Sequence, residues 1–259
     1  SPTNPGTTRP AAPPSAASPT DMSAQLAIMV RGGQKPACNI CQDVGMVYDA
    51  SVRRDDLGGY VLCECQKRIS RCDGRAPFEY YDPKTRSMRP CTSRTAREAL
   101  SKVQRQEKQS DIPRRYRGKF LRDILIDEED IHFAIDFAFD LIRTFQTNET
   151  PIGLYLYGGT GSGKTLLSCA ILNELVRLYQ TRVRYAKISR DILGRLRASF
   201  NPNSEFYGEG RQIEQQLATV PALVIDDFGV HKETEWVNSV LYDLIDARYE
   251  NNLLTILTS

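Results

Sequence analysis

The sequence predicts an α/β fold, in which a parallel β-sheet with flanking helices is joined to a small amino-terminal module containing paired cysteines. Three observations predict this arrangement. A short apolar strand, Leu154–Tyr157, runs into a glycine-rich turn and then a helical stretch. Further along, a second apolar strand ends in two carboxylates, Asp226 and Asp227. Two close cysteine pairs precede both strands.

The glycine-rich turn has the pattern G-x-x-x-x-G-K-[ST] at every fixed position. Glycines allow consecutive backbone N–H groups to face one anion, and the helix that follows, residues 166–179, adds the positive charge of its N-terminus. We expect Lys164 to reach the β- and γ-phosphates and the Thr165 hydroxyl to ligate Mg²⁺. The strand–turn–helix context favours a nucleoside-triphosphate site over a turn that binds nothing. Its residues are Gly158, Gly159, Thr160, Gly161, Ser162, Gly163, Lys164 and Thr165.

The strand that starts at Ala222 supplies the second half of this predicted site. Asp226 is expected to hold Mg²⁺, through water, and Asp227 to orient or deprotonate the attacking water. Asp227 and Lys164 are therefore the candidate catalytic residues. A strand that ends in a polar turn does not by itself indicate a binding site. Together with the glycine-rich turn about 60 residues earlier, it indicates a nucleotide site.

The charge of the chain is unevenly distributed. The 259 residues carry a net charge of +2, yet residues 66–122 hold 17 Lys/Arg and 6 Asp/Glu, which is +11 and leaves −9 elsewhere. Such a basic block indicates nucleic acid or an acidic partner, or a solvated linker. No apolar run approaches the ~18 residues of a membrane span, and no signal peptide is visible. We therefore expect no membrane partner.

The cysteines predict a zinc site. Cys38 and Cys41 form one pair and Cys63 and Cys65 another, and two pairs of thiolates can close a tetrahedral Zn²⁺ site. The second pair is C-x-C rather than C-x₂-C, so Cys72 is an alternative ligand, and four unrelated thiols are the other interpretation. Seven cysteines with such pairing favour a reducing, cytoplasmic compartment over a disulfide framework. Cys91 and Cys169 have no partner in the sequence.

The remaining segments are assigned in order. Residues 1–24 are rich in Pro, Ala, Ser and Thr and are expected to be disordered. Residues 25–92 form the zinc module, with hairpin strands at 44–48 and 60–62, and residues 93–110 form a basic helix or linker. The core at 111–259 continues with an amphipathic helix at 131–145, a strand at 181–186, a helix at 188–200, a loop at 201–210, a helix at 212–219, a helix at 233–248 and a strand at 253–258. In the helix at 233–248 we expect Trp236, Val240, Leu244 and Ile245 to face inward.

From Asp111 onward the chain resembles the DnaC/DnaI helicase loaders, with the transposition helper IstB as a close relative. The resemblance rests on the stretches IPRRY, GGTGSGKT, IDDFG and RYENNLLTILTS, and it covers roughly 150 of 259 residues. It implies an AAA+ ATPase core that uses ATP and Mg²⁺, with Lys164 and Thr165 as the Walker A pair and Asp226 and Asp227 as the Walker B pair. The paired cysteines look like the zinc module of DnaI-type loaders, which IstB-type proteins usually lack.

The resemblance also implies contacts with single-stranded DNA. The helix with Arg195 and Arg197 corresponds to a region that these proteins place against DNA, where the arginines can contact phosphates and Phe200 or Tyr207 can stack on bases. A solvated basic helix face is the alternative. His231 lies near the second strand end and has a weaker claim to a functional role.

The sequence departs from the family pattern after Ser259, where the sensor asparagine, the last strand and the arginine-finger segment would follow. We therefore expect a carboxy-terminally truncated core. Its sheet would have four strands, with the phosphate-loop strand at an exposed edge. Such a chain should bind nucleotide better than it hydrolyses it.

The predicted function is an ATP-dependent helicase loader of DNA replication. Its zinc module would bind the replicative helicase, and its core would sense ATP and single-stranded DNA. Weak ATP hydrolysis would serve as a timing device, and the protein would act as a homo-oligomer on the helicase. An IstB-like transposition helper and an inactive zinc-binding scaffold are the alternatives.

Overall fold

The structure is a computed structural model that describes Leu26, Ile28 and residues 36–52, 59–124, 129–147, 153–229 and 234–259. The predicted disordered segment 1–24 and His231 lie outside the described residues. Within the described ranges, no helix combines the length and the apolarity that a membrane crossing requires.

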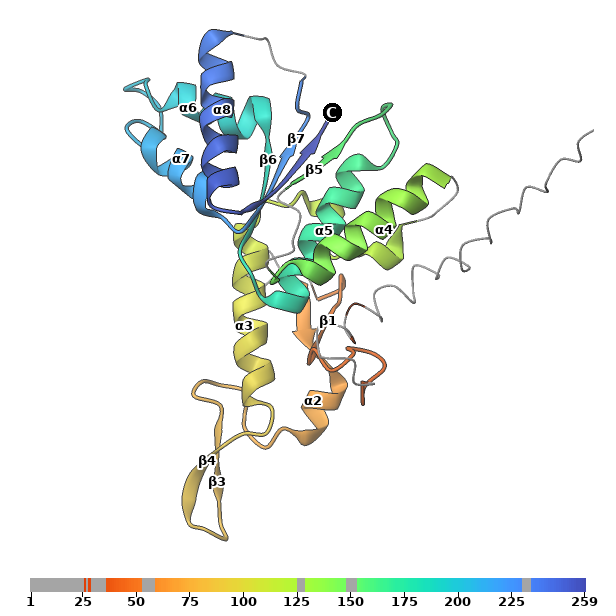
Figure 1. Cartoon of the computed structure of the whole chain (residues 1–259). Helices are drawn as coiled ribbons and strands as arrows, with labels where there is room; N and C mark the ends of the chain where they lie inside the picture. Colours follow the sequence, from red (N-terminus) through yellow and green to blue (C-terminus); the bar gives the residue numbers. More distant parts are fainter. Residues whose placement is uncertain are drawn as a thin grey trace, which may run out of the picture.

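A four-stranded parallel sheet forms the centre of the larger part of the molecule (Figure 1). Its strands are β5 (Gly153–Leu156), β8 (Leu254–Thr258), β7 (Ala222–Asp226) and β6 (Val183–Lys187), in that spatial order. All five residues of β7 are buried, as expected of a central strand. The phosphate-loop strand β5 lies at an edge, where Tyr155 is half exposed. Both the predicted fold class and the edge position of β5 are confirmed.

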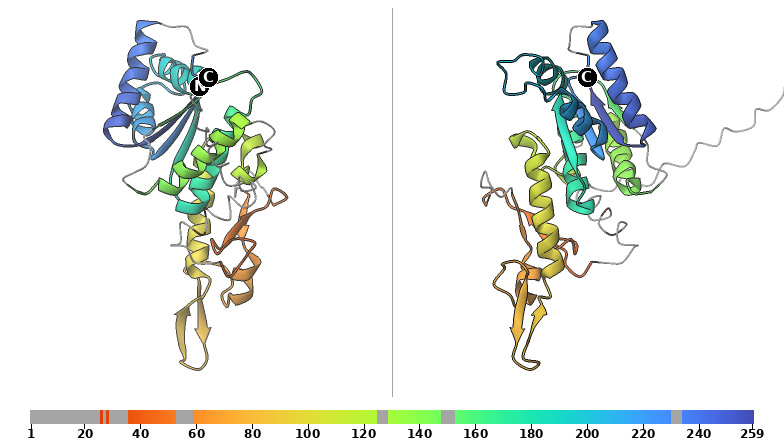
Figure 2. Two further views of the ribbon diagram at one scale, coloured as in Figure 1. Left: turned by 45° about the vertical axis from the view of Figure 1, so that its right-hand side comes forward. Right: turned by 90° about the vertical axis from the view of Figure 1, so that its left-hand side faces the viewer.

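Helices cover both faces of the sheet (Figure 2). The strand β7 shows why, because alternate residues enter different clusters: Ala222 and Val224 pack in one, Leu223 and Ile225 in the other. The first cluster includes α4 (Glu129–Thr144) and α5 (Lys164–Tyr179); the second includes the π-helical segment η3 (Ile188–Gly194), α6 (Arg195–Ala198), α7 (Gly210–Thr219) and α8 (Glu235–Glu250).

Two helices differ from the sequence prediction. The segment predicted as one helix over 188–200 is divided into η3 and α6, and the carboxylate of Asp191 accepts a hydrogen bond from the Lys187 N–H at the start of η3. In α8 the predicted inward position of Trp236 is wrong, because its side chain is exposed. The prediction for Leu244 is confirmed, and the buried face follows Val237, Leu241 and Leu244, so Val237 rather than Trp236 faces the core at the start of the helix.

Arg248, at the end of α8, explains part of the RYENN stretch. It is fully buried, and its guanidinium donates to the carbonyls of Leu217, Val220 and Leu254 and to the Thr255 hydroxyl. These acceptors lie at the end of α7 and the start of β8, so one side chain satisfies backbone groups where three elements meet. Burial lowers the pKa of Arg248 to about 10.

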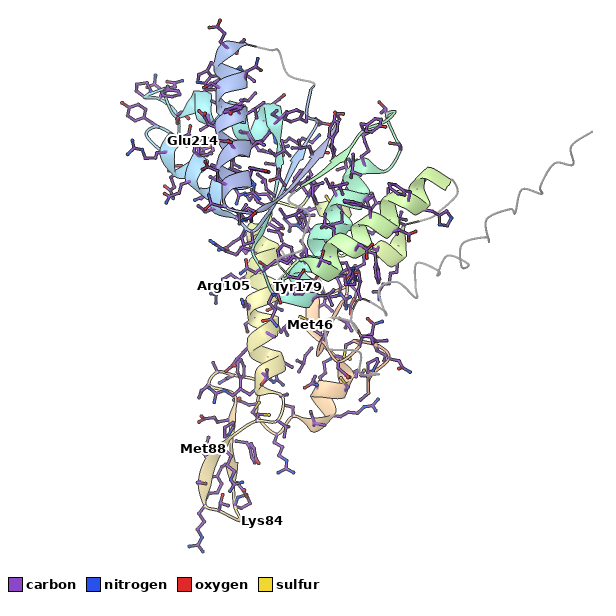
Figure 3. All side chains as sticks on the ribbon, in the orientation of Figure 1. Met46, Lys84, Met88, Arg105, Tyr179 and Glu214 are labelled. Carbon is purple, nitrogen blue, oxygen red and sulfur yellow. The ribbon has the colours of Figure 1, made fainter. Side chains whose placement is uncertain are left out.

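The amino-terminal module is built from two hairpins. Strands β1 (Met46–Tyr48) and β2 (Tyr60–Leu62) pair antiparallel and precede α2 (Glu64–Ile69), close to the predicted hairpin. The second hairpin, β3 (Glu79–Asp82) and β4 (Ser87–Pro90), was not predicted. It projects beyond the end of α3 (Figure 1), and Lys84 and Met88 mark its far part in Figure 3.

The helix α3 (Arg94–Gln109) joins the module to the sheet. It is not merely an exposed basic helix or linker, because Val103, Gln106 and Glu107 are buried on it. Glu107 accepts a hydrogen bond from the Gly59 N–H, and Tyr60 of β2 donates to the Asn173 carbonyl of α5 at 3.5 Å. One hydrophobic cluster therefore runs from the hairpin through α3 to α5. Two short turns of 3₁₀-helix follow, η1 (Arg114–Tyr116) and η2 (Leu121–Asp123).

Candidate nucleotide and zinc sites

The glycine-rich turn between β5 and α5 is open to solvent. Gly161 and Gly163 have φ values of 87° and 84°, a region that side chains other than glycine rarely adopt. A Cβ atom added at either position would meet nothing within 4 Å, so the loop has room on its exposed side. The geometry fits a phosphate group held by backbone N–H donors at the N-terminus of α5.

Lys164 closes this loop. Its Nζ atom donates to the carbonyls of Gly158 and Gly159, both at 2.8 Å, and to the Ser162 hydroxyl at 3.2 Å. The ammonium group therefore lies against the turn itself, with acceptors that a phosphate oxygen could replace. The predicted phosphate-binding residues lie together in one short loop, as a consecutive motif must.

The structure joins this loop to the end of β7 through Asp226. The Thr165 hydroxyl donates to Asp226 Oδ1 at 2.9 Å, which brings the two predicted magnesium-binding side chains into contact. Asp226 is almost completely buried, and it also accepts hydrogen bonds from the hydroxyls of Tyr185 and Thr258. A hydroxyl and a carboxylate at this separation are suitable ligands for Mg²⁺, directly or through water.

Asp227 lies beside Asp226 but has a different environment. Its side chain is about half exposed (49%), and its backbone φ of 61° turns it away from the strand. Lys187 Nζ donates to Asp227 Oδ2 at 2.5 Å and lies 3.8 Å from Asp226 Oδ2. The hydrogen bond to Asp227 raises the pKa of Lys187. The candidate water-orienting acid is therefore paired with a cation in this structure.

Sequence reasoning missed three residues at this site, Tyr185, Lys187 and Thr258. Thr258 bridges the two acids, because its hydroxyl donates to Asp226 Oδ1 at 2.5 Å and accepts from the Asp227 N–H at 3.2 Å. Tyr185 and Lys187 come from β6, and Thr258 from β8, which flank β7. Their position at the ends of neighbouring parallel strands was the available signal, since such ends meet at one edge of a sheet.

The four predicted zinc ligands also meet. The Sγ atoms of Cys38, Cys41, Cys63 and Cys65 all lie within 4.8 Å of one another. The Cys38–Cys63 and Cys41–Cys65 Sγ separations are 3.9 and 3.5 Å. Tetrahedral Zn²⁺ with Zn–S bonds of about 2.3 Å requires sulfur atoms about 3.8 Å apart, so the donor set fits zinc.

The backbone around these cysteines is shaped for a metal knuckle. After the first pair the chain turns sharply, with Asp43 and Gly45 at positive φ. The Asp43 carboxylate accepts from the N–H groups of Ala37 and Cys38, which fixes the approach of the first ligand. Backbone hydrogen bonding lowers the pKa of Cys38 to about 7, whereas burial raises the pKa of Cys41. A metal would supply the charge that stabilises the buried thiolate.

Cys72 and Cys91 lie in a separate group. Cys91 Sγ accepts a hydrogen bond from the Arg71 N–H at 3.2 Å and lies 3.5 Å from the Ser70 hydroxyl, which is also 3.7 Å from Cys72 Sγ. Despite burial, hydrogen bonds from Ser93, Arg71 and Ser70 lower the pKa of Cys91 to about 5. Cys72 is not among the four clustered thiols. Cys169 is buried in α5.

The residues predicted to contact DNA point to different places. The guanidinium of Arg195 lies over the ring of Phe206, 5.4 Å from its centroid, and that of Arg197 lies over Trp236 of α8 at 5.3 Å. The side chain of Phe200 is 74% exposed. Arg195 also lines a cavity beside β6, which the other two residues do not line.

Comparison with known proteins gives a family and two relatives. Residues 122–259 match the family model described as IstB-like ATP binding protein. The replicative helicase loader DnaI of Bacillus subtilis (strain 168) is 29% identical over 125 residues, which cover 46% of this chain and 37% of DnaI. The uncharacterized protein YdaV of Escherichia coli (strain K12) is 31% identical over 91 residues, which cover 35% of this chain and 34% of YdaV. The matched part thus spans little more than a third of either relative.

Solved structures also match part of this chain. A crystal structure of DnaI has 26% sequence identity and a TM-score of 0.48, with 58% of this chain and 76% of that chain covered. A crystal structure of the DnaC helicase loader has 25% identity and a TM-score of 0.45, with 57% and 79% covered.

Proposed function

The chain belongs to the IstB-like ATP-binding protein family, and from this premise we propose that it is an ATP-dependent helicase loader in DNA replication. The observation that carries the proposal is the hydrogen bond between Thr165 and Asp226, which makes one site of the glycine-rich loop and the acidic strand end. The similarity to the helicase loader DnaI supports replication as the context.

The side chains of the site suit ATP hydrolysis. Bound Mg²⁺–ATP supplies the transferable phosphoryl group, and Thr165 and Asp226 are the residues to hold the metal. Lys164 neutralises phosphate charge from within the loop. Asp227 accepts a hydrogen bond from the attacking water. For this, its hydrogen bond with the Lys187 ammonium must first break. The ion pair with Lys187 favours slow hydrolysis, which suits a timing device.

The other parts of the chain are assigned to partners. The four-cysteine module holds Zn²⁺ and binds the replicative helicase, and Arg195, Arg197 and Phe200 contact single-stranded DNA in a homo-oligomer that assembles on the helicase. The clustered thiols support the zinc assignment. The excess of Lys and Arg over Asp and Glu at residues 66–122 supports an acidic or nucleic-acid partner for that part of the chain. The proposed loader acts in the cytoplasm.

An IstB-like transposition helper is the second candidate. The description of the matching family favours it, because it is named after IstB. The four-cysteine cluster and the similarity to DnaI favour the loader instead. Preference for duplex over single-stranded DNA, together with binding of a transposase, would select the transposition helper.

The test is a pull-down of the cognate replicative helicase with and without ATP. The loader proposal expects wild-type protein to capture the helicase, Lys164→Ala to lose the ATP dependence, and Cys38→Ser to lose the capture itself. Cys72→Ser is the matched control, because Cys72 is a cysteine outside the zinc cluster. Absence of helicase capture in every nucleotide state would refute the proposal.

A further inference from the structure

A cavity of about 480 Å³ lies beside β6, and none of its lining residues belongs to the glycine-rich loop. One wall is the segment 111–117, which follows α3 and includes η1. The opposite wall is formed by three residues of η3 (Arg190, Asp191 and Gly194), the first residue of α6 and Phe206 in the loop before α7. The two walls are brought together because Tyr185 of β6 donates its N–H to the Ser110 carbonyl at the end of α3.

The cavity is positively charged. Its lining includes four arginines and two aspartates. Both aspartates are already paired: Asp191 accepts two hydrogen bonds from Arg190, at 2.7 and 3.0 Å, and Asp111 lies 2.7 Å from Arg184, which is outside the lining. Positive charge is therefore in excess at the walls, which favours an anionic ligand.

Two of these arginines are held in place by their surroundings. Arg117 donates from Nε to the Ile112 carbonyl at 2.9 Å, which fixes its guanidinium at one wall. Arg195 lies over the ring of Phe206 at the other. Planar guanidinium groups suit the geometry of phosphate oxygens, and an aromatic ring next to them offers a surface for a base. Phosphate and aromatic base occur together in a nucleotide.

We propose that this cavity binds one nucleotide unit of single-stranded DNA, with its phosphate at Arg117 and Arg195 and its base against Phe206. The volume lies within the range of about 300–1,000 Å³ that small-ligand pockets span. The aromatic ring favours a nucleic acid over an acidic peptide, which would need only the positive charge.

The inference rests on the proposed function in that single-stranded DNA is a ligand, and it goes further in two respects. Half of the cavity, the segment 111–117, lies outside the 122–259 range that matches the family. The inference also distinguishes two arginines that the proposed function treats alike: Arg195 lines the cavity, whereas the guanidinium of Arg197 lies over Trp236 on α8.

The experiment is fluorescence anisotropy with a labelled oligo(dT) of about 20 nucleotides, longer than the roughly 4–16 nucleotides of common single-strand sites. Arg117→Gln removes a charge but keeps a donor for the Ile112 carbonyl, and Phe206→Leu removes the ring while keeping an apolar side chain. Arg143→Gln is the control, because Arg143 is a partly exposed arginine on α4, on the other side of the sheet from α6 (Figure 1). ATP binding and thermal unfolding report whether each variant is folded.

We expect Arg117→Gln and Phe206→Leu each to weaken binding about tenfold, and Arg143→Gln to stay within about twofold of wild type. Arg117→Gln should also reduce the slope of log affinity against log salt by about 0.7, the value for one single-strand phosphate contact, whereas Phe206→Leu should leave that slope unchanged.

Three results would overturn the inference. The first is wild-type affinity for oligo(dT) in both folded variants, which would show that DNA binds outside the cavity. The second is equal competition by thymidine monophosphate at the same nucleotide concentration, which would make the ligand a free nucleotide. The third is displacement of the oligonucleotide from wild-type protein by poly-glutamate at equal charge, which would indicate that the cavity binds an acidic peptide. Failure of wild-type protein to bind oligo(dT) would instead count against the DNA part of the proposed function.

Discussion

The glycine-rich loop and the cavity beside β6 are both suited to phosphate, but they are built in opposite ways. The loop consists of consecutive residues, 158–165, and its donors are backbone N–H groups at the start of α5 together with Lys164. The cavity takes side chains from three separate segments, represented by Arg117, Arg195 and Phe206. One site is local and the other exists only because the fold assembles it.

The difference teaches what each site depends on. A local site keeps its geometry as long as one strand, one turn and one helix are in place. An assembled site also requires the elements that carry its walls to stay together, and here the wall 111–117 follows α3, which shares a hydrophobic cluster with the β1–β2 hairpin. Changes far from the cavity should therefore affect it, while the loop should respond chiefly to changes within it.

Removal of zinc should have the largest effect. Metal binding at structural thiolate sites contributes about 10 kcal/mol or more of apparent free energy, and a shared hydrophobic cluster connects the β1–β2 hairpin to α3. We expect a chelator, or Cys63→Ser, to lower the unfolding temperature by at least about 10 °C. Calorimetry with metal analysis by mass spectrometry measures both.

The same treatment separates the two sites. Zinc-free protein should bind oligo(dT) more weakly while ATP affinity changes less, because the wall 111–117 follows α3 directly. Cys72→Ser should retain one zinc per chain and wild-type stability. An equal loss of affinity for oligo(dT) and for ATP would show that the loop depends on the zinc module as much as the cavity does.

Lys164→Ala should have the next largest effect, and only on the local site. Its ammonium group is the one lysine held against the loop carbonyls in the described part of the chain, so its removal deletes charge-assisted contacts with phosphate. We expect ATP affinity to fall about 100-fold, or about 2.7 kcal/mol, as measured by calorimetric titration. Binding of oligo(dT) without nucleotide should be unchanged; a parallel loss would mean that the two sites are one.

The same contrast explains how much the sequence could predict. The loop, the Asp226 strand and the cysteine pairs are patterns of adjacent residues, and the structure has them close to the predicted positions. Lys187 and Thr258 carry no such pattern, because they join the site only through the order of the strands. On α8 the prediction is correct for Leu244 and wrong for Trp236, because apolar character alone does not show that Arg197 gives this large ring a partner at the surface.

The β3–β4 hairpin was missed for a similar reason. Tyr81 and Met88 face each other across its strands, yet both are exposed, so the segment lacks the buried alternation by which a strand is recognised. Its pairing is carried by backbone hydrogen bonds and by a turn with Arg86 at positive φ. None of these features is visible in hydropathy.

Lys187→Ala should sharpen the comparison, since Lys187 lies between the two sites. Its ammonium pairs with Asp227, and it directly precedes η3, which contributes Arg190, Asp191 and Gly194 to the cavity lining. Loss of the ion pair should release Asp227 to accept a proton from water, and we expect the turnover number for ATP hydrolysis to rise about tenfold with little change in KM.

Lys187→Met removes the charge but keeps an apolar stem of similar length, and it should behave as the alanine variant does. Steady-state phosphate release measures all three proteins. A decrease in turnover in both variants would mean that Lys187 assists the reaction by contacting the substrate rather than holding Asp227 back.

Tyr185→Phe should have the smallest effect. The phenol donates a hydrogen bond to the buried Asp226, and burial together with that contact raises its pKa, so the O–H group stays protonated and remains a donor at neutral pH. Phenylalanine removes one of several donors, since Thr165 and Thr258 still contact the carboxylate. The expected loss is about 1 kcal/mol, seen as a roughly fivefold weaker Mg²⁺-dependent ATP affinity.

Because the β6 backbone also holds the end of α3 through the Tyr185 N–H, which phenylalanine keeps, oligo(dT) binding should be unaffected. A larger loss of DNA binding than of ATP binding would show that the side chain, not the strand, links the two sites.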